Sequence, residues 1–337
     1  MSVSIFMVKQ AENKATAALA LNYTDAIVQT KIVAGAAYLG TKSSTNIGGM
    51  CCDQSGNLYI ADVTQHIIVK VIEAGKVTKI AGSAGTSGDN GTTTVTLENA
   101  RFNGPRGLAC DKSGNIYVAD AGNNQIRVIR GGYVSVLAGA GDASSGFVSG
   151  NAHTARLNNP TDVAVLPDGN VVVCDSGNHA VRKIVGGKLW TVAGGSTGNR
   201  YSILANAYGD IFASPEALDV DRNGNIWVAD TGNDLVKKID QRGFVYLMAG
   251  STDGKRLGST ALTCQFKSLK GIAIDPSGNI WVADRNDASG GRVLRFTQHS
   301  QIVGVVADFN GSTNYDAGLL ALAVSPAGKV FVATDAT

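Results

Sequence analysis

One heptapeptide recurs along the chain at nearly constant spacing, and this repeat restricts the fold more than any other feature of the sequence. Its five clear copies are GNLYIAD at 56–62, GNIYVAD at 114–120, GNVVVCD at 169–175, and GNIWVAD at both 224–230 and 278–284. A weaker sixth copy, GKVFVATD, covers 328–335. The closing aspartates are 58, 55, 55, 54 and 51 residues apart. This regular spacing predicts six similar structural units.

The second unit shows how each repeat divides into four short strands. Apolar or alternating segments occupy 107–111, 116–120, 125–130 and 133–137, with Gly-Gly at 131–132 between the last two. A two-residue glycine turn is typical of a hairpin, and a continuous apolar run is typical of a strand buried on both faces. A four-stranded unit cannot bury both faces alone, so it stacks on its neighbours. We therefore predict an all-β protein, a six-bladed β-propeller of four-stranded antiparallel blades.

The two ends of the chain predict how the ring closes. The last unit, 319–335, contains only two strands before the chain ends. The Ala-Gly pair that closes each fourth strand first occurs at 34–35, ahead of the first heptapeptide. We therefore expect N-terminal strands at 18–24 and 28–33 to complete the C-terminal blade. A radial arrangement closed in this way leaves only short, protected sheet edges.

This prediction divides the chain into an N-terminal arm or extra strand at 1–16 and a single propeller at 17–337. The segment 2–8 has the pattern of a strand. It is either an added strand or an arm onto a neighbour. In the alternative reading it is the third strand of the last blade, and 10–25 are an insertion. We prefer the first reading because hairpin connections are normally short.

These motifs resemble the NHL repeat family. The matching segments are NGPRGLACD at 103–111, GNIYVAD at 114–120, GNNQIRVI at 122–129 and VSVLAG at 134–139. The resemblance covers about residues 18–337. It implies a propeller of the kind that serves as a protein-binding, an RNA-binding or occasionally a catalytic domain, so the fold does not decide the function.

Composition excludes several classes of protein. The 337 residues carry a net charge of +2, and only 17% of them are charged, which argues against a broad nucleic-acid footprint. The sequence contains no stretch of 18 apolar residues, so we expect no membrane span. The N-terminus lacks the basic segment of a signal peptide, so we expect a cytoplasmic or virion location. The five cysteines lack C-x-x-C spacing, which predicts reduced, mostly buried thiols rather than a disulfide framework or a zinc site.

The start of each innermost strand provides the candidate binding site. Aligning the units brings Arg106, Thr161, Glu216 and Lys270 to the mouth of the axis, with Asp162 one position further in. We expect either a polar binding pocket or a solvated, salt-bridged mouth. The set holds no histidine and only one inner carboxylate, too few ligands for a catalytic metal. We therefore expect no catalytic residue, no metal and no cofactor.

Two further repeated features have structural interpretations. The aspartates that end the second strands are expected to accept hydrogen bonds from their own loops; they are Asp62, Asp120, Asp175, Asp230 and Asp284. The third strands carry basic residues, which we expect on a wet face spread around the whole propeller rather than in an RNA-binding groove.

The sequence therefore favours a non-enzymatic binding or structural module. Its partners would be protein or glycan, bound at the loop-rich rim, and it would fit a component of a larger assembly such as a phage virion or tail. The alternatives are a hydrolase or lyase with a site at the axis, and an RNA-binding propeller. The apolar N-terminal segment and the low charge favour the assembly component.

Overall fold

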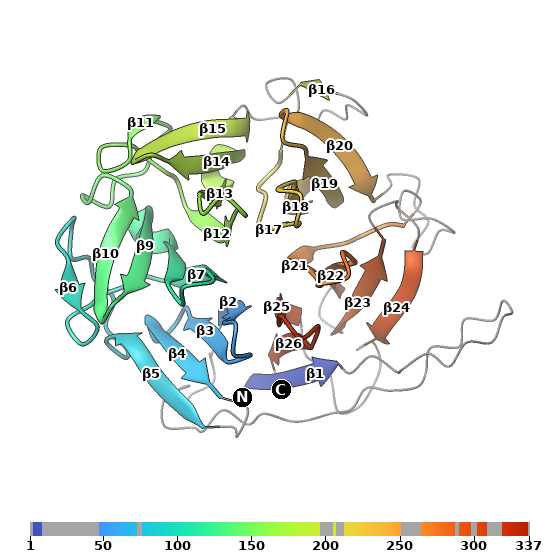
Figure 1. Cartoon of the computed structure of the whole chain (residues 1–337), viewed down its shortest axis with the longest axis horizontal. Coiled ribbons are helices and arrows are strands. Elements are labelled where there is room, and N and C mark those ends of the chain that lie inside the picture. Colours follow the sequence, from blue (N-terminus) through green and yellow to red (C-terminus); the bar gives the residue numbers. More distant parts are fainter. Residues whose placement is uncertain are drawn as a thin grey trace, which may run out of the picture.

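The computed structural model is an all-β propeller whose antiparallel sheets stand around a central axis (Figure 1). It describes residues 3–8, 47–72, 76–195, 205–206, 212–250, 264–286, 290–297, 302–308 and 319–335. The innermost strands are β2 (Ile47–Cys52), β7 (Pro105–Cys110), β12 (Pro160–Val165), β17 (Ala217–Val220), β21 (Leu269–Ile274) and β25 (Leu319–Val324). The second strands carry the heptapeptides and are β3 (Leu58–Asp62), β8 (Ile116–Asp120), β13 (Val171–Asp175), β18 (Ile226–Asp230), β22 (Ile280–Asn286) and β26 (Val330–Asp335).

Five sheets continue outward with two more strands. The third strands are β4 (Ile67–Val71), β9 (Gln125–Arg130), β14 (Ala180–Val185), β19 (Leu235–Ile239) and β23 (Gly290–Phe296). The fourth strands are β5 (Val77–Gly82), β10 (Tyr133–Ala138), β15 (Lys188–Gly194), β20 (Phe244–Ala249) and β24 (Ile302–Asp308). Short 3₁₀ turns follow the second strand in three sheets and are η1 (Ala121–Asn123), η2 (Ser176–Asn178) and η3 (Thr231–Asn233).

Three long loops between blades form strands of their own. They are β6 (Val95–Thr96), β11 (Gly150–Asn151) and β16 (Ala205–Asn206). Each pairs with the fourth strand of the following blade, respectively β10, β15 and β20. The chain thus covers the outer edge of the next blade on its way to the axis. Covering these backbone groups protects an edge that could otherwise pair with another chain.

The sixth sheet corrects the predicted blade count. Among the described residues it holds three strands, in the order β1 (Val3–Val8), β26 and β25. The described chain therefore contains five complete blades, where the sequence predicts six. The segments 18–24 and 28–33, expected to complete this sheet, lie outside the described residues.

Strand β1 also corrects the preferred reading of the N-terminus. It pairs antiparallel with β26 along its whole length, from Val3 opposite Asp335 to Val8 opposite Val330. It therefore occupies the third-strand position that the sequence pattern predicted for residues 18–24. That assignment assumed that paired strands are joined by a short hairpin. Strands β1 and β26 are not consecutive in the sequence, and they pair as the first and last strands of the described chain. The first and last described strands consequently lie side by side (Figure 1).

The core consists of apolar layers between neighbouring sheets. The second strands β3, β8, β13 and β18 are buried at every position, as their continuous apolar runs predict. One layer joins the last sheet to the first, where Ala321 and Phe331 pack with Ile47 and Val69. This contact closes the ring of innermost strands around the axis. Within the described ranges, no helix is long and apolar enough to cross a membrane.

A candidate binding cavity at the propeller axis

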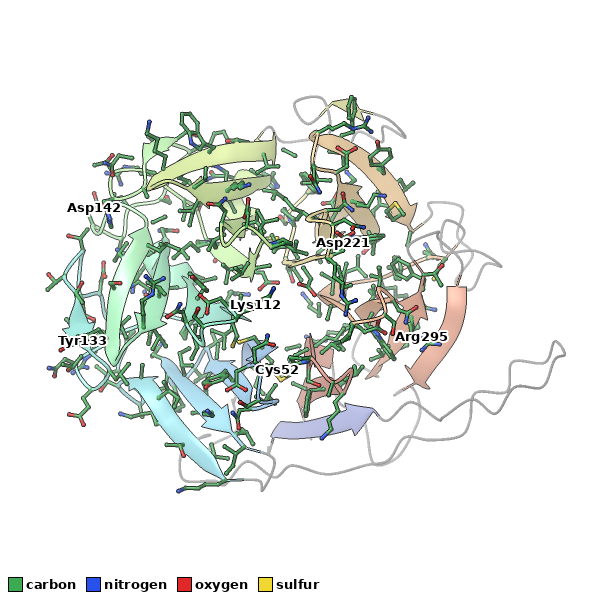
Figure 2. The ribbon with its side chains drawn as sticks, in the orientation of Figure 1. Cys52, Lys112, Tyr133, Asp142, Asp221 and Arg295 are labelled. Carbon is green, nitrogen blue, oxygen red and sulfur yellow. The ribbon has the colours of Figure 1, made fainter. Side chains whose placement is uncertain are left out.

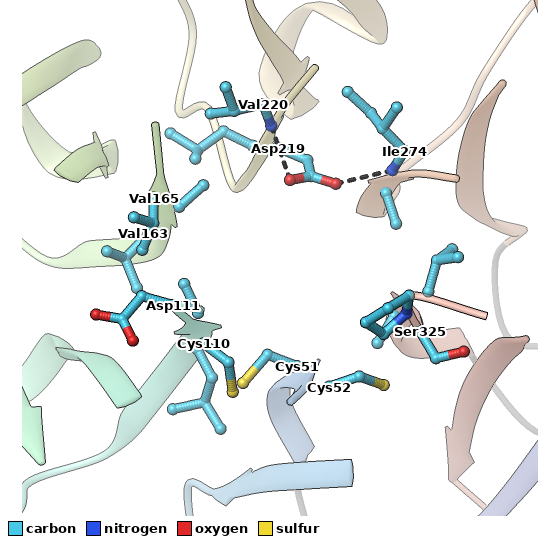
Figure 3. Close-up of a pocket in the computed structure, with 18 of the residues that line it drawn as sticks. Cys51, Cys52, Cys110, Asp111, Val163, Val165, Asp219, Val220, Ile274 and Ser325 are labelled. Carbon is cyan, nitrogen blue, oxygen red and sulfur yellow. Dashed lines mark hydrogen bonds between the residues drawn. The ribbon is translucent and has the colours of Figure 1, made fainter. Parts of the chain in front are cut away.

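The end of the axis bordered by the turns between first and second strands is hollow. A cavity of about 810 Å³, here called the channel cavity, opens there (Figure 3). The last residue of each innermost strand lines it, and together these six half-buried side chains form what we call the collar: Cys52, Cys110, Val165, Val220, Ile274 and Val324. Four aliphatic side chains and two thiols therefore surround the axis at one level, so the collar suits an apolar group.

One carboxylate deeper in the cavity wall bonds to two strands at once. Asp219 accepts a hydrogen bond from its neighbour Val220 N at 2.7 Å and another from Ile274 N at 2.8 Å (Figure 3). Burial raises the pKa of Asp219 to about 6. Innermost strands are sheet edges with backbone N–H groups that need acceptors. Asp219 meets this need between β17 and β21.

Asp162 does the same one blade earlier. It accepts hydrogen bonds from Val163 N at 2.8 Å and from Leu218 N at 2.9 Å, which links β12 to β17. Burial raises its pKa to about 7. Both oxygens of each carboxylate are therefore bonded to backbone, so neither Asp162 nor Asp219 is arranged as a free general base.

Three thiols lie along the first two innermost strands. Burial raises the pKa of Cys51 well above its usual range, and a hydrogen bond with Cys110 raises it further. Burial raises the pKa of Cys52 to about 12. Cys51 and Cys52 are therefore protonated at neutral pH and poor nucleophiles. Like Cys174 and Cys264, they are thiols that take no part in a disulfide.

The opposite mouth of the axis contains four of the five predicted site residues. Thr161, Asp162, Glu216 and Lys270 line a cavity of only about 30 Å³, whereas Arg106 is not part of its wall. Lys270 Nζ lies 2.8 Å from Glu216 Oε2, and Thr161 Oγ1 donates to the carbonyl of Pro215 at 3.2 Å. The geometry corresponds to the salt-bridged mouth rather than to a pocket that holds a ligand.

The repeated aspartates bond more widely than their own loops. Asp62 Oδ1 accepts from Thr64 N and Gln65 N of its own loop, as expected. Of the other four, Asp120, Asp175 and Asp230 also accept from the side-chain amide of the asparagine three residues later in their own loops. All four accept in addition from the segment that leads into the innermost strand of the same blade. These donors are the backbone N–H groups of Asn103 to Asp120, Asn158 to Asp175, Ala213 to Asp230 and Lys267 to Asp284, at 2.7–2.9 Å.

A buried cation from the third strand faces each of these four carboxylates. Arg127 lies 3.6 Å from Asp120, Arg182 2.8 Å from Asp175, Lys237 3.0 Å from Asp230 and Arg292 2.9 Å from Asp284. The expectation of a wet third strand is wrong at these positions because the segment that leads into the same blade covers them. Phe102, Phe147 and Phe212 of these segments lie against Arg127, Arg182 and Lys237. Burial raises the pKa of Asp120 to about 7 even beside Arg127.

A second ring of aspartates was not predicted from the sequence. Asp53, Asp111, Asp221 and Asp275 each begin a D-x-x-G-N turn between the first and second strands. Each accepts from the backbone N–H and the side-chain amide of the asparagine four residues later. The recurring D-x-x-G-N spacing is a sequence signal for this turn. These turns surround the open end of the channel cavity.

The arrangement provides a shaped hollow with an apolar collar and a polar rim, without an evident reactive group among the described residues. His66 Nδ1 and His179 Nδ1 accept hydrogen bonds from Gly104 N and Ser214 N, away from the cavity. Over the described ranges, no three side chains of the His, Cys, Asp and Glu types come together as metal ligands. Recognition of an apolar group is the chemistry that this geometry supports best.

Comparison with known proteins identifies the repeat. The NHL repeat matches at residues 102–129, 157–184 and 212–239. Teneurin-4 from Mus musculus is 29% identical over 257 residues, which is 67% of this chain and 9% of teneurin-4. NHL repeat-containing protein 2 from Bos taurus is 30% identical over 173 residues, which is 47% of this chain and 23% of that protein. The chain thus spans less than a quarter of these relatives.

A solved structure shares the fold. A gluconolactonase from Xanthomonas campestris superposes with a TM-score of 0.55 and 16% identity, over 89% of this chain and 91% of that one. At this identity the likeness concerns the architecture alone.

Proposed function

We propose that this NHL-repeat propeller is a non-enzymatic binding module whose channel cavity receives an apolar side chain of a partner protein. The observation that carries the proposal is the collar, where aliphatic side chains and thiols from six innermost strands surround the axis. A rigid ring of strands that holds an apolar hollow pre-organises the binding surface, which lowers the entropic cost of association. Turn residues at the rim, among them Lys112 and Arg222, would supply polar contacts; Figure 2 shows Lys112 near the centre of the ring.

The binding end differs from the one suggested by loop length alone. Three long loops on the other rim contribute β6, β11 and β16 to neighbouring blades. This pairing favours an edge-covering role for them. We therefore prefer a protein partner at the channel cavity to a glycan at the loop-rich rim. Within this proposal, the three-stranded sheet β1–β26–β25 serves as the sixth blade of the ring.

A role in a larger assembly, in a virion or in the cytoplasm, is the broader setting that we propose. Its support is that none of the five cysteines forms a disulfide, which fits a reducing compartment. Binding to RNA receives less support, because four third-strand cations are buried against aspartates.

A peptide-selection experiment tests the binding site. A phage-displayed library of random peptides would be selected on the full chain, and enriched peptides would be titrated onto two variants. Val165→Arg places a long cation in the collar, whereas Val185→Arg changes a side chain that is 36% exposed at the end of β14, outside the channel cavity. We expect apolar peptides whose binding is lost in Val165→Arg and retained in Val185→Arg. Equal binding to both variants would exclude the channel cavity as the site.

An enzymatic alternative rests on the raised pKa of Asp162 and on the lactonase-like fold. Its test is a lactone-hydrolysis assay with added Ca²⁺, Mn²⁺ or Zn²⁺, with Asp162→Asn as the matched variant. The binding proposal predicts no turnover above buffer in either protein. Metal-dependent turnover that Asp162→Asn abolishes would favour the enzyme instead.

A further inference from the structure

The first two innermost strands bring two cysteines together although 58 residues separate them in the sequence. Cys51 lies on β2 and Cys110 on β7, and the two thiols are close enough for Cys110 to raise the pKa of Cys51. Figure 3 shows the two sulfurs facing each other at the wall of the channel cavity. Both side chains pack in the same apolar layer between the first two blades.

Glycines explain why these strands come so close. A Cβ added to Gly49 would lie 2.7 Å from the Cα of Gly107, so only residues without a side chain fit where β2 and β7 meet. The cysteines follow two residues after Gly49 and three after Gly107, on the same pair of strands. The close approach fixed by the glycines therefore holds the two thiols in contact.

We propose that Cys51 and Cys110 form a reversible disulfide between the first two blades when hydrogen peroxide enters the channel cavity. In the first step the Cys110 thiol, which is partly exposed at the collar, reacts with one peroxide molecule to give a sulfenic acid and one water. In the second step the Cys51 sulfur attacks the Cys110 sulfur, and the S–S bond forms as a second water leaves. Two thiols are oxidised and one peroxide is reduced to two waters.

The surroundings favour a disulfide over a bound soft metal ion. A metal held by two thiolates would leave negative charge in an apolar wall, where charge is costly without a partner. The cations that line the channel cavity are Lys112 and Arg222, and both are exposed at its rim. A disulfide is uncharged, so it fits the layer that already buries Cys51.

Burial also predicts the pH dependence of the reaction. The thiolate is the reactive form, and the pKa of Cys51 is raised. Bond formation should therefore be slow at neutral pH, and its rate should rise about tenfold for each unit by which the pH increases towards the pKa of the thiol. Because the reaction is slow at neutral pH, low concentrations of hydrogen peroxide should leave the two thiols reduced.

The experiment is a mass measurement on the full chain. Protein at mildly alkaline pH would be treated with hydrogen peroxide, quenched by alkylation, and analysed as intact protein and as non-reduced peptides. We expect the loss of two hydrogen atoms, a peptide linking Cys51 to Cys110, and reversal by dithiothreitol. Cys51→Ser and Cys110→Ser should abolish the linked peptide, whereas Cys52→Ser and Cys174→Ser should retain it.

Three results would overturn the proposal. They are a link from Cys52 to Cys110, oxygen addition without loss of hydrogen, and an unchanged mass. If Cys51→Ser folds poorly, Cys51→Ala keeps the position apolar and carries the same expectation. The readout is covalent, so it does not depend on the peptide binding proposed above.

Discussion

Arg182 Nη1 lies 2.8 Å from Asp175 Oδ2, and neither side chain is exposed to solvent. Both belong to the third blade: the guanidinium comes from its third strand, β14, and the carboxylate from its second strand, β13. Asp175 also accepts from Asn158 N, so a single carboxylate joins three segments of one blade. The pair repeats in four blades, which makes it part of the design of the repeat rather than a local feature.

Replacing Arg182 with methionine should destabilise the protein by about 3–5 kcal/mol, because it leaves a buried carboxylate without its cation. Arg182→Lys should retain most of the stability, since Lys237 fills the equivalent position in the fourth blade at 3.0 Å from Asp230. Urea unfolding of each variant measures the effect.

The matched control is Lys183→Met on the same strand. Lys183 Nζ lies 3.4 Å from Asp168, but the two side chains are 30% and 54% exposed. Losing this surface pair should change stability by less than about 1 kcal/mol. Similar losses for Arg182→Met and Lys183→Met would show that burial of the pair is unimportant.

Gly107→Ala should destabilise the innermost strands strongly. Its added Cβ would lie 1.9 Å from Asp162 Oδ1 and 2.5 Å from the Asp162 Cα, so backbone must move. Overpacking of this kind typically costs about 1–3 kcal/mol. Gly271→Ala, at the equivalent position of β21, meets Leu322 at 3.0 Å and should cost less. Thermal unfolding of both variants gives the comparison, and an equal loss would refute the crowding argument.

The recurrence of whole motifs made much of this fold predictable. Aligning the heptapeptides brought Thr161, Glu216 and Lys270 to one mouth of the axis, where the structure has them. This worked because each repeat is one supersecondary unit, so equal sequence positions have equal places around the ring.

What depends on contacts between units was not predictable in the same way. Arg127 and Arg182 alternate with apolar residues, which is the pattern of a wet strand face, yet the long segments that lead into their blades bury them. The pairing of β1 with β26 joins the ends of the chain, so no local pattern indicates it. The strands β6 and β11 have two residues each, too few for any periodicity. The collar was not predicted, because its six side chains come from six strands that meet only in the folded ring.

Protonation of His66 should weaken the contact between the first two blades. His66 Nδ1 accepts from Gly104 N at 2.9 Å, which requires the neutral ring, and burial lowers the pKa of His66. The unfolded chain then binds the proton more readily, so stability is lost as pH falls below about 6.5. Asn124 occupies the equivalent place in the next blade and accepts from Asn159 N at 2.7 Å.

His66→Asn therefore makes a clean test. It keeps an acceptor and tolerates the left-handed backbone, where φ is 58°. The variant should remain folded, and its free energy of unfolding should fall less than that of the unmodified protein between about pH 7 and pH 5, because asparagine does not titrate. His66→Ala, which removes the acceptor, should lose about 1–3 kcal/mol at neutral pH and less at acidic pH, where protonation has already weakened the contact. An unchanged pH profile in His66→Asn would show that His66 does not titrate in this range.

Asp162 should give stability the opposite dependence on pH. Burial raises its pKa to about 7 in the folded protein, against 3.8 as the ordinary value. The folded state therefore holds the proton more tightly, and the contribution present at low pH is lost as pH rises from about 4 to about 7, by roughly 2–4 kcal/mol. Asp162→Asn removes the titrating group, so its free energy of unfolding should fall less steeply over this range.

The absolute stability of Asp162→Asn is a separate matter, because an amide can accept only one of the two backbone hydrogen bonds from Val163 and Leu218. The slope is the decisive quantity, measured by urea unfolding at several pH values. Asp168→Asn serves as the control, since Asp168 is exposed and its pKa is lowered rather than raised. If Asp162→Asn and the unmodified protein show the same slope, the carboxylate of Asp162 remains ionised throughout, and its two backbone hydrogen bonds outweigh the effect of burial.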